Sequence, residues 1–316
     1  MPEPVDVKLA NVGSADGGPG EDRPGPIAAR RHQGAARPVR GAWLRRALRH
    51  RSLALGLALV TILCLAVVAG PWFLPGDINA QDPAMAFSPP SLAFPMGTDA
   101  FGRDMLVRVL YGGRTTILAS LSVVALGGLV GTLFGILAGF FGGVSGFAIM
   151  RFIDLLLAFP GIMLALVVAA ILGAGLWHGV IAIAVILAPI FARLIAGATM
   201  EVRGMAYVDA ARTLGAASGW IIVRHVLPNV ASSIIVLTTG WIGIAALWIA
   251  ALGFIGLGVQ PPQPELGSIL NDGQNYITLA WWITVFPGLF LALFVVGVNL
   301  IGDGLRDELD PTVAGR

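Results

Sequence analysis

Long apolar runs constrain the fold of this chain more than any other feature. Six such runs occur along the sequence, and each is long enough to cross a bilayer as a tilted helix. Of the 316 residues, 56% are hydrophobic and only 12% are charged, which is too little charge to cover a soluble domain. The sequence therefore predicts an all-α integral membrane protein with six transmembrane helices. We expect these helices at 53–73, 116–140, 152–172, 180–198, 234–259 and 280–301.

The distribution of arginine predicts how these spans are oriented, because cytoplasmic loops carry an excess of basic residues. With the N-terminus in the cytoplasm, the outer side holds only three arginines and the inner side holds all the others. The charges that enter the spans, Asp154, Arg193 and Asp303, then lie at inner ends. We expect a multi-pass protein of the cytoplasmic (inner) membrane with both termini in the cytoplasm. Four tryptophans fall at outer ends, as in an aromatic belt: Trp72, Trp177, Trp281 and Trp282.

Composition divides the chain into three parts. Residues 1–42 are rich in Gly, Pro, Ala and Arg without periodicity, which predicts a disordered cytoplasmic tail. Residues 43–113 hold the first span and an extracellular segment. Residues 114–316 hold the other five spans, with a polar loop at 200–229 that lies on the cytoplasmic side in the expected orientation.

The second run carries a glycine at every fourth position. On a helix, this spacing forms a groove that lets another helix approach closely, where lipid offers no hydrophobic drive for association. We expect the groove to pack a helix of the same bundle, with an interface to another subunit as the alternative. The glycines are Gly127, Gly131, Gly135, Gly139 and Gly143.

The sequence lacks the motifs of several kinds of functional site, namely ATP-binding, metal-binding and catalytic sites. The only lysine is Lys8, which is followed by Leu9 and preceded by no glycine run, so the chain lacks a lysine-containing P-loop for ATP. If nucleotide drives this protein, another subunit binds it. The four histidines lack metal-ligand spacing, and we expect neither a metal site nor catalytic residues. The single cysteine, Cys64, cannot form an intrachain disulfide.

The stretch at 207–229, between the fourth and fifth runs, is too polar to cross a membrane. Asp209 and the two alanines after it can start a short helix, which Gly215 can end with a positive φ. A second helix is expected through 220–226, with Pro228 at the head of the next span. Taken alone, the composition favours an amphipathic hairpin at the membrane surface that binds no partner.

The spacing of this stretch resembles the EAA loop of ABC-importer permeases. In that family Glu-Ala-Ala is followed after three residues by Gly, and nine residues later by Ile-x-Leu-Pro; here Asp209 replaces the Glu and His225 the Ile. The resemblance implies a coupling helix that docks on an ATPase subunit and transmits its closure to the spans. The resemblance implies two roles for six positions. The two positions nearest the fifth span form a hinge into it, and the four earlier positions dock on the ATPase subunit. The six positions are Asp209, Ala210, Ala211, Gly215, Leu227 and Pro228.

Two outer stretches narrow the resemblance. Residues 97–104 look like the G-T-D-x-x-G-R-D signature of dipeptide, oligopeptide and nickel importers, and 253–273 resemble the segment after the fifth span of that branch, with Leu266 where a Trp is usual. For the signature we expect a turn whose acid and base pair locally, and no metal or catalytic site. The signature residues are Gly97, Thr98, Asp99, Gly102, Arg103 and Asp104.

The resemblance implies the type I ABC-importer permease fold with a cytoplasmic coupling helix, and the C-type permease subunit of an importer of di- or oligopeptides. The implied partners are a B-type permease, two ABC ATPase subunits and an extracytoplasmic substrate-binding lipoprotein. No cofactor is expected in this chain, since ATP and Mg²⁺ would be bound by the ATPase subunits. Nickel is the alternative substrate. A stand-alone secondary transporter would need buried ionisable residues near the middle of the membrane, and we expect charges only at span ends.

Overall fold

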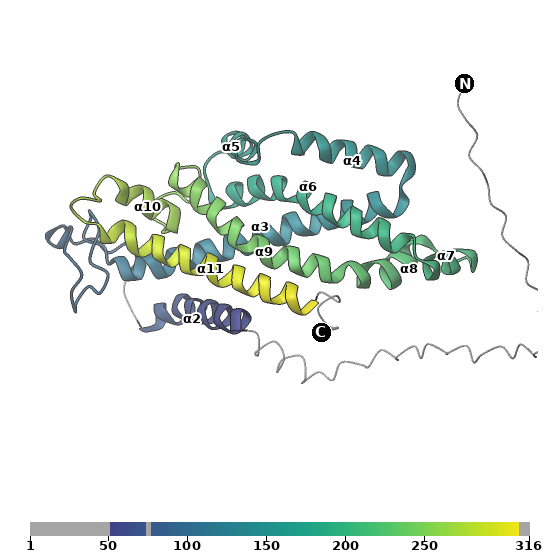
Figure 1. Cartoon of the computed structure of the whole chain (residues 1–316). Helices are drawn as coiled ribbons and strands as arrows, with labels where there is room; N and C mark the ends of the chain where they lie inside the picture. The colour runs from purple at the N-terminus through teal and green to yellow at the C-terminus, as the bar shows by residue number, and fades with distance from the viewer. Residues whose placement is uncertain (1–50, 74–76, 310–316) are drawn as a thin grey trace, which may run out of the picture. The chain divides into compact units, whose positions relative to one another are not determined.

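The computed structural model describes residues 51–73 and 77–309, so the expected tail at 1–42 lies outside the described residues. Within the described ranges the regular secondary structure is helical, and the two residues Thr98 and Asp104 form one isolated β-bridge. Five helices are long and apolar enough to cross a membrane (Figure 1). They are α2 (Arg51–Phe73), α3 (Met105–Phe141), α6 (Leu176–Arg203), α9 (Leu227–Phe254) and α11 (Trp282–Leu309).

Shorter helices connect these five. They are the 3₁₀ turn Pro83–Met85, α4 (Gly143–Leu157), α5 (Gly161–Leu172), α7 (Ala206–Thr213), α8 (Ser218–Ile221), the π-helical segment Ile222–Val226 and α10 (Leu266–Gln274).

The third expected span, 152–172, is not one straight helix. The chain forms α4 and α5, which meet at an angle of 89° across a short break. Pro160 lies at the break as the N-cap of α5, with an extended backbone that α-helix does not allow. Proline has no N–H for a helical hydrogen bond and disfavours helix in the residue before it. The described residues therefore contain six spans only if this bent pair is counted as one.

The other helices differ from the apolar runs mainly at their ends. α3 begins at Met105, well before residue 116, because Asp104 caps its first turn by accepting a hydrogen bond from the Leu106 N–H at 2.8 Å. α9 already begins at Leu227, and it stops at Phe254, shortly before Gly256 with φ of +83°. Hydropathy misses the polar first turns of α3 and α9 because it measures apolar content and not caps.

The glycine groove of α3 lies directly against α6. A Cβ atom added to Gly135 would lie 2.7 Å from the Ala192 carbonyl oxygen, and one added to Gly139 would lie 2.6 Å from that of Ala196. Gly127 and Gly131 meet Ala184 and Ala188 in the same way, so the contact repeats every four residues along both helices. This places α3 and α6 close together over most of their length. Gly143 is not part of the groove, since it begins α4 and has open space around it.

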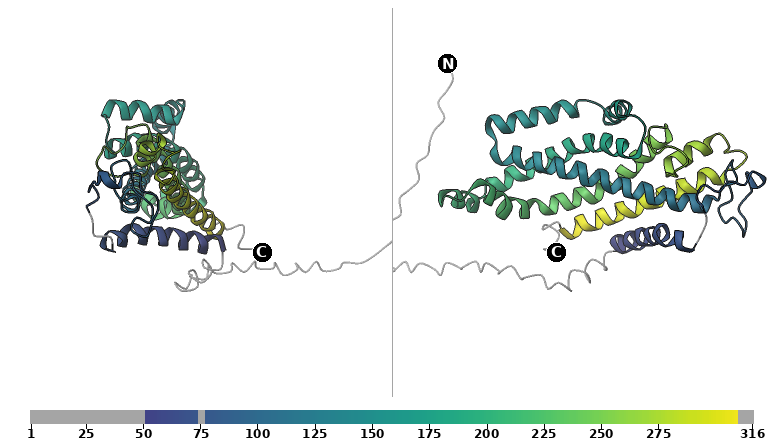
Figure 2. Two further views of the ribbon diagram at one scale, coloured as in Figure 1. Left: turned by 90° about the vertical axis from the view of Figure 1, so that its left-hand side faces the viewer. Right: turned by 180° about the vertical axis from the view of Figure 1, so that it is seen from behind.

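The polar connections gather at opposite ends of the helices. The segment 77–104 and α10 lie at one end, and α7 and α8 lie at the other, as Figure 1 and the right-hand view in Figure 2 show. α10 packs against α9, α11 and α3. This separation agrees with the expectation that the signature and the 207–229 stretch face opposite sides of the membrane.

Trp282 differs from the other tryptophans expected in an aromatic belt. Trp72, Trp177 and Trp281 are exposed, whereas Trp282 is buried and its indole N–H donates to the Thr98 carbonyl oxygen at 3.0 Å. The expectation that it faces the lipid interface is therefore wrong, since it fastens the first turn of α11 to the signature segment.

Candidate functional site

Gly215 ends α7 in a left-handed backbone conformation, with φ of +81°. The Gly215 N–H donates to the Arg212 carbonyl oxygen at 2.9 Å, and the Ala216 N–H donates to that of Ala211 at 3.1 Å. The second of these bonds is typical of a Schellman cap. A Cβ atom at Gly215 would meet no atom within 4 Å, so only the positive φ, and not crowding, favours glycine here.

The expected second helix at 220–226 is not a separate arm of a hairpin. α8, the π-helical segment and α9 follow one another without a break and make one 37-residue helix from Ser218 to Phe254. The Leu227 N–H donates to the Ile222 carbonyl oxygen, five residues back, which is the π pattern. Pro228 has no N–H to continue the regular ladder, and the wider turn before it accommodates this. Leu227 and Pro228 thus lie exposed in the first turn of α9.

One face of α7 and α8 is buried against the ends of the long helices. Val208, Ile221 and Val226 are each exposed by 1% or less. The Arg212 guanidinium lies 5.1 Å from the centre of the Phe140 ring, at the end of α3. The cluster of buried side chains therefore includes residues of α7 and of three long helices, α3, α6 and α9. The buried side chains that meet here are Ile136, Phe140, Ile195, Val202, Val208, Ile221, Val226 and Val230.

The opposite face of this segment is open. Asp209 and Ala210 are exposed on α7, and Ala211 is half-buried. Large apolar side chains are exposed around them, which is typical of a surface that binds another protein. The ring of His225 lies 5.6 Å from that of Tyr207 and 5.1 Å from that of Trp220, so His225 packs between two aromatic rings. The exposed apolar side chains are Tyr207, Leu214, Trp220 and Val223.

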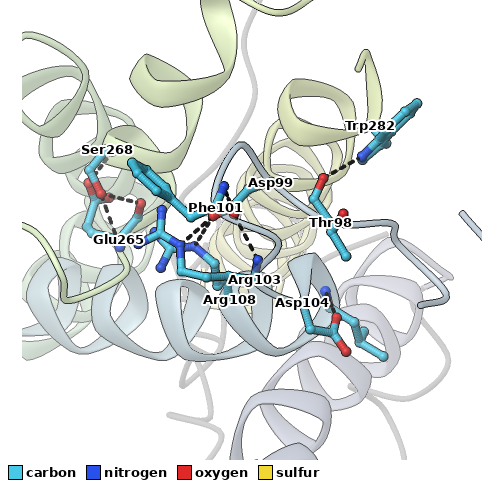
Figure 3. Close-up of polar contacts among 10 residues, drawn as sticks. Thr98, Asp99, Phe101, Arg103, Asp104, Arg108, Glu265, Ser268 and Trp282 are labelled. Atoms are coloured by element: carbon cyan, nitrogen blue, oxygen red, sulfur yellow. Dashed lines mark hydrogen bonds and ion pairs between the residues drawn. The ribbon is translucent and has the colours of Figure 1, made fainter. Parts of the chain in front are cut away.

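The signature residues build a tight turn at the other end of the molecule (Figure 3). Asp99 Oδ1 accepts from the backbone N–H groups of Phe101 at 2.9 Å and Arg103 at 3.0 Å. Its other oxygen, Oδ2, pairs with Arg103 Nε at 2.6 Å. Gly97 and Gly102 have φ of +71° and +73°, and a side chain at Gly102 would collide with the Asp82 backbone. Each acid and base in the turn thus has a structural partner.

Arg108 joins this turn, although the signature pattern does not include it. Its Nε lies 3.5 Å from Asp99 Oδ2, and the residue is only 4% exposed. Its Nη1 is buried and has no hydrogen-bond partner among the described residues. The sequence offered no signal for this burial, because Arg108 looks like an ordinary basic residue on the outer side.

Glu265 is the second ionisable residue whose burial the sequence does not predict. It is fully buried, and its carboxylate accepts from the Thr116 hydroxyl at 2.9 Å, the Gly267 N–H at 2.9 Å and the Ser268 N–H at 3.0 Å. Burial raises the pKa of Glu265, and these three hydrogen bonds act against that rise. Glu265 lies at the start of α10, outside the five long helices, so its burial does not contradict the expectation that charges in the spans lie at their ends. A Glu three residues before a Ser, ahead of a helix, is the capping signal that could have located it.

Comparison with known protein families identifies the family of this chain. The family described as "Binding-protein-dependent transport system inner membrane component" matches residues 131–315, which include α7 and the whole 207–229 stretch. The chain belongs to this family. A second family, described as the N-terminal TM domain of oligopeptide transport permease C, matches residues 38–90 of the permease. These matches confirm the prediction of a C-type ABC-importer permease, a transport component and not an enzyme.

Curated relatives resemble the permease over most of its length. The probable D,D-dipeptide transport system permease protein DdpC of Escherichia coli (strain K12) is 42% identical over 258 residues, which cover 82% of this chain and 87% of the relative. The di/tripeptide transport system permease protein DppC of Pseudomonas aeruginosa is 41% identical over 281 residues, covering 87% and 92%. The glutathione transport system permease protein GsiD of Pectobacterium atrosepticum is 40% identical over 275 residues, covering 87% and 91%.

A solved structure confirms the fold class. A chain of the MetNI methionine ABC transporter, in an inward-facing conformation, superposes on the permease with a TM-score of 0.53. The match covers 65% of this chain and 98% of that chain at 20% sequence identity. The permease therefore has the all-α fold of an ABC-importer permease, as the spacing of its motifs predicts.

Proposed function

We propose that this permease is the C-type subunit of an ATP-driven importer that moves di- or oligopeptides across the cytoplasmic membrane. The observation that carries the proposal is the geometry of α7. It is a short, capped helix whose Val208 is buried in a cluster with side chains of α3, α6 and α9, while the other face is open. The peptide substrate is supported by the relatives described above, two of which are named for dipeptides or tripeptides.

The open face of α7 suits an ATPase subunit as its partner. Asp209, Ala210 and Ala211 supply its docking surface, beside exposed Tyr207 and Leu214. ATP and Mg²⁺ are bound by two such ATPase subunits, in keeping with the absence of a P-loop lysine from this chain. A B-type permease and an extracytoplasmic binding lipoprotein complete the importer. Both termini and α7 lie in the cytoplasm, and the signature turn lies outside.

The packing of α7 supports a mechanical role. When the ATPase subunits close, they displace α7, and the buried side chains Val208 and Ile221 carry that displacement to the ends of α3, α6 and α9. Packed cores of this kind shift between discrete arrangements and do not deform continuously. The Gly215 cap keeps α7 short and stiff, so that displacement moves it as one unit. Leu227 and Pro228, after the π-helical segment, form the hinge at which α9 responds.

ATP-driven uptake into proteoliposomes that contain the complete importer tests this function. We expect saturable uptake of a labelled dipeptide or tripeptide that requires ATP, both ATPase subunits and the binding protein. Nickel uptake is measured in parallel with the same vesicles. Transport of nickel without peptide would replace the proposed substrate, and peptide uptake driven by an ion gradient without ATPase subunits would replace the proposed class of transporter.

A further inference from the structure

A polar cavity of about 260 Å³ opens beside the signature turn. Its walls come from three parts of the chain that are distant in sequence, namely the signature turn, α10 with the turn after it, and the first residues of α11. None of the roles described above uses this cavity. Its lining includes two acids, one arginine, two asparagines and two aromatic rings: Asp99, Phe101, Arg103, Asn271, Asp272, Asn275 and Tyr276.

The acidic and basic side chains in and behind the cavity wall are equal in number, but not every one of them forms an ion pair. Asp99 is committed to Arg103 and Arg108. Asp272 is exposed in the wall, and no described residue forms a hydrogen bond or an ion pair with its carboxylate. Close behind the wall, the buried Nη1 of Arg108 lacks an acceptor. The two aspartates and two arginines sum to zero, and Asp272 is the acid that remains unpaired at the cavity. The buried Nη1 of Arg108 is not part of the cavity wall.

This arrangement fits a ligand with both a positive and a negative group. An ammonium group can pair with Asp272, and a carboxylate can pair with Arg103, which lines the cavity and bonds to Asp99 through Nε alone among its guanidinium nitrogens. A ligand of one sign would leave the opposite wall charge desolvated and unmatched. The cavity is slightly smaller than the usual range for drug-sized ligands, roughly 300 Å³ and above, so it suits a whole small zwitterion.

We propose that this cavity is a binding site on the permease itself for a free short peptide, with the peptide ammonium group on Asp272 and its carboxylate on Arg103. The side chains of Asn275 and Tyr276 lie in the same wall and supply polar contacts for the peptide bond. The identity of the ligand rests on the proposed function, because a peptide importer presents such zwitterions at this end of the chain. The site would receive a peptide before it enters the spans.

Equilibrium dialysis of labelled Ala-Ala against the assembled importer, without its binding protein, tests the site directly. We expect saturable binding, with N-acetyl-Ala-Ala and Ala-Ala-amide competing at least about tenfold less well. Asp272→Asn should weaken Ala-Ala binding by about tenfold and abolish the preference over N-acetyl-Ala-Ala, while the preference over the amide remains. Asp77→Asn is the matched control, since Asp77 is exposed on the same side outside the cavity, and it should bind as wild type.

The proposal is overturned if the wild-type importer shows no saturable binding, or if Asp272→Asn leaves both affinity and preference unchanged. It is also overturned if Asp272→Asn weakens only the binding of the binding protein, because the cavity then receives a side chain of that protein. ATP-driven peptide uptake separates the two proposals. Uptake that persists without detectable binding here refutes this site and leaves the proposed function intact.

Discussion

The hydroxyl of Thr116 in α3 donates to Oε1 of Glu265, at the start of α10, at 2.9 Å. This hydrogen bond joins two residues that lie 149 positions apart in the sequence. The same hydroxyl accepts from the Leu266 N–H at 3.3 Å. The Glu265 carboxylate in turn holds the first turn of α10 through the N–H groups of Gly267 and Ser268. One threonine thus fastens the outer helix α10 to the long helix α3.

Thr116→Val should therefore destabilise the permease. The substitution keeps the shape of the side chain but leaves the Leu266 N–H unpaired and removes one donor from a buried carboxylate, which costs about 1–3 kcal/mol. A lower apparent Tm of the purified protein in detergent would report this loss. Thr115→Val is the control, because the Thr115 hydroxyl bonds to the Tyr111 carbonyl oxygen of its own helix. Equal Tm values for the two variants would contradict the bridging role of Thr116.

The contact between α3 and α6 predicts opposite effects for one substitution at two glycines. Gly135→Ala places a methyl group 2.7 Å from the Ala192 carbonyl oxygen and should cost about 1–3 kcal/mol by forcing the helices apart. Gly197→Ala in α6 meets no atom within 4 Å and should keep or raise stability, because alanine favours helix by about 1 kcal/mol over glycine. Thermal unfolding of both variants measures the difference. A stable Gly135→Ala variant would show that the groove is not tightly packed.

Substitutions at Gly215 test whether α7 couples ATP hydrolysis to transport, without changing how the helices pack. Gly215→Val should abolish ATP-driven uptake while the protein still inserts into the membrane, because a β-branched residue strongly disfavours a φ of +81°. Gly215→Asn should retain most uptake, since asparagine tolerates this conformation and the position has open space. Uptake and ATP hydrolysis are measured in the same proteoliposomes. Normal transport by the valine variant would contradict the need for a rigid cap on α7.

The sequence predicts the long helices well because lipid demands a continuous apolar stretch of about 20 residues. It fails at the third span, where Pro160 bends an apolar run that hydropathy treats as continuous. The spacing around Gly215 also predicts the end of α7, since a positive φ is a local property of the backbone. The continuity of α8 with α9 is not predictable in this way, because it depends on a π-helical segment that relieves Pro228.

The local sequence pattern does not predict that Arg108 and Glu265 are buried. Arg108 lies in the first turn of α3 and Glu265 lies at the start of α10, where charges ordinarily meet water. Their burial arises because α10 folds back against α3 and α9, which is a contact between distant parts of the chain. The signature pattern accounts for the Asp99–Arg103 pair, but the second partner, Arg108, becomes visible only in three dimensions.

Peptide binding at the outer cavity should weaken as the pH falls. Loss of hydration raises the pKa of Asp272 above its usual range, Asp99 adds to the rise, and Arg108 and Arg103 oppose it. The ionised carboxylate is the form that binds an ammonium group, so a raised pKa means that affinity is lost at higher pH than for an ordinary aspartate, whose pKa is about 3.9. Dialysis of Ala-Ala over a pH series measures the profile. A flat profile in wild type, matching that of Asp272→Asn, would contradict this assignment.

Site-specific crosslinking can show whether an ATPase subunit attaches at α7. Ala210→Cys is introduced into a chain whose only cysteine, Cys64, is first replaced by alanine, and a photoreactive maleimide is attached in the assembled importer. We predict a crosslink from Ala210→Cys to the ATPase subunit and none from Ala80→Cys, because Ala80 is exposed and belongs to the segment 77–104 at the opposite end of the helices. A folded, ATP-hydrolysing complex in which Ala210→Cys never crosslinks to the ATPase subunit would mean that the subunit does not attach at α7.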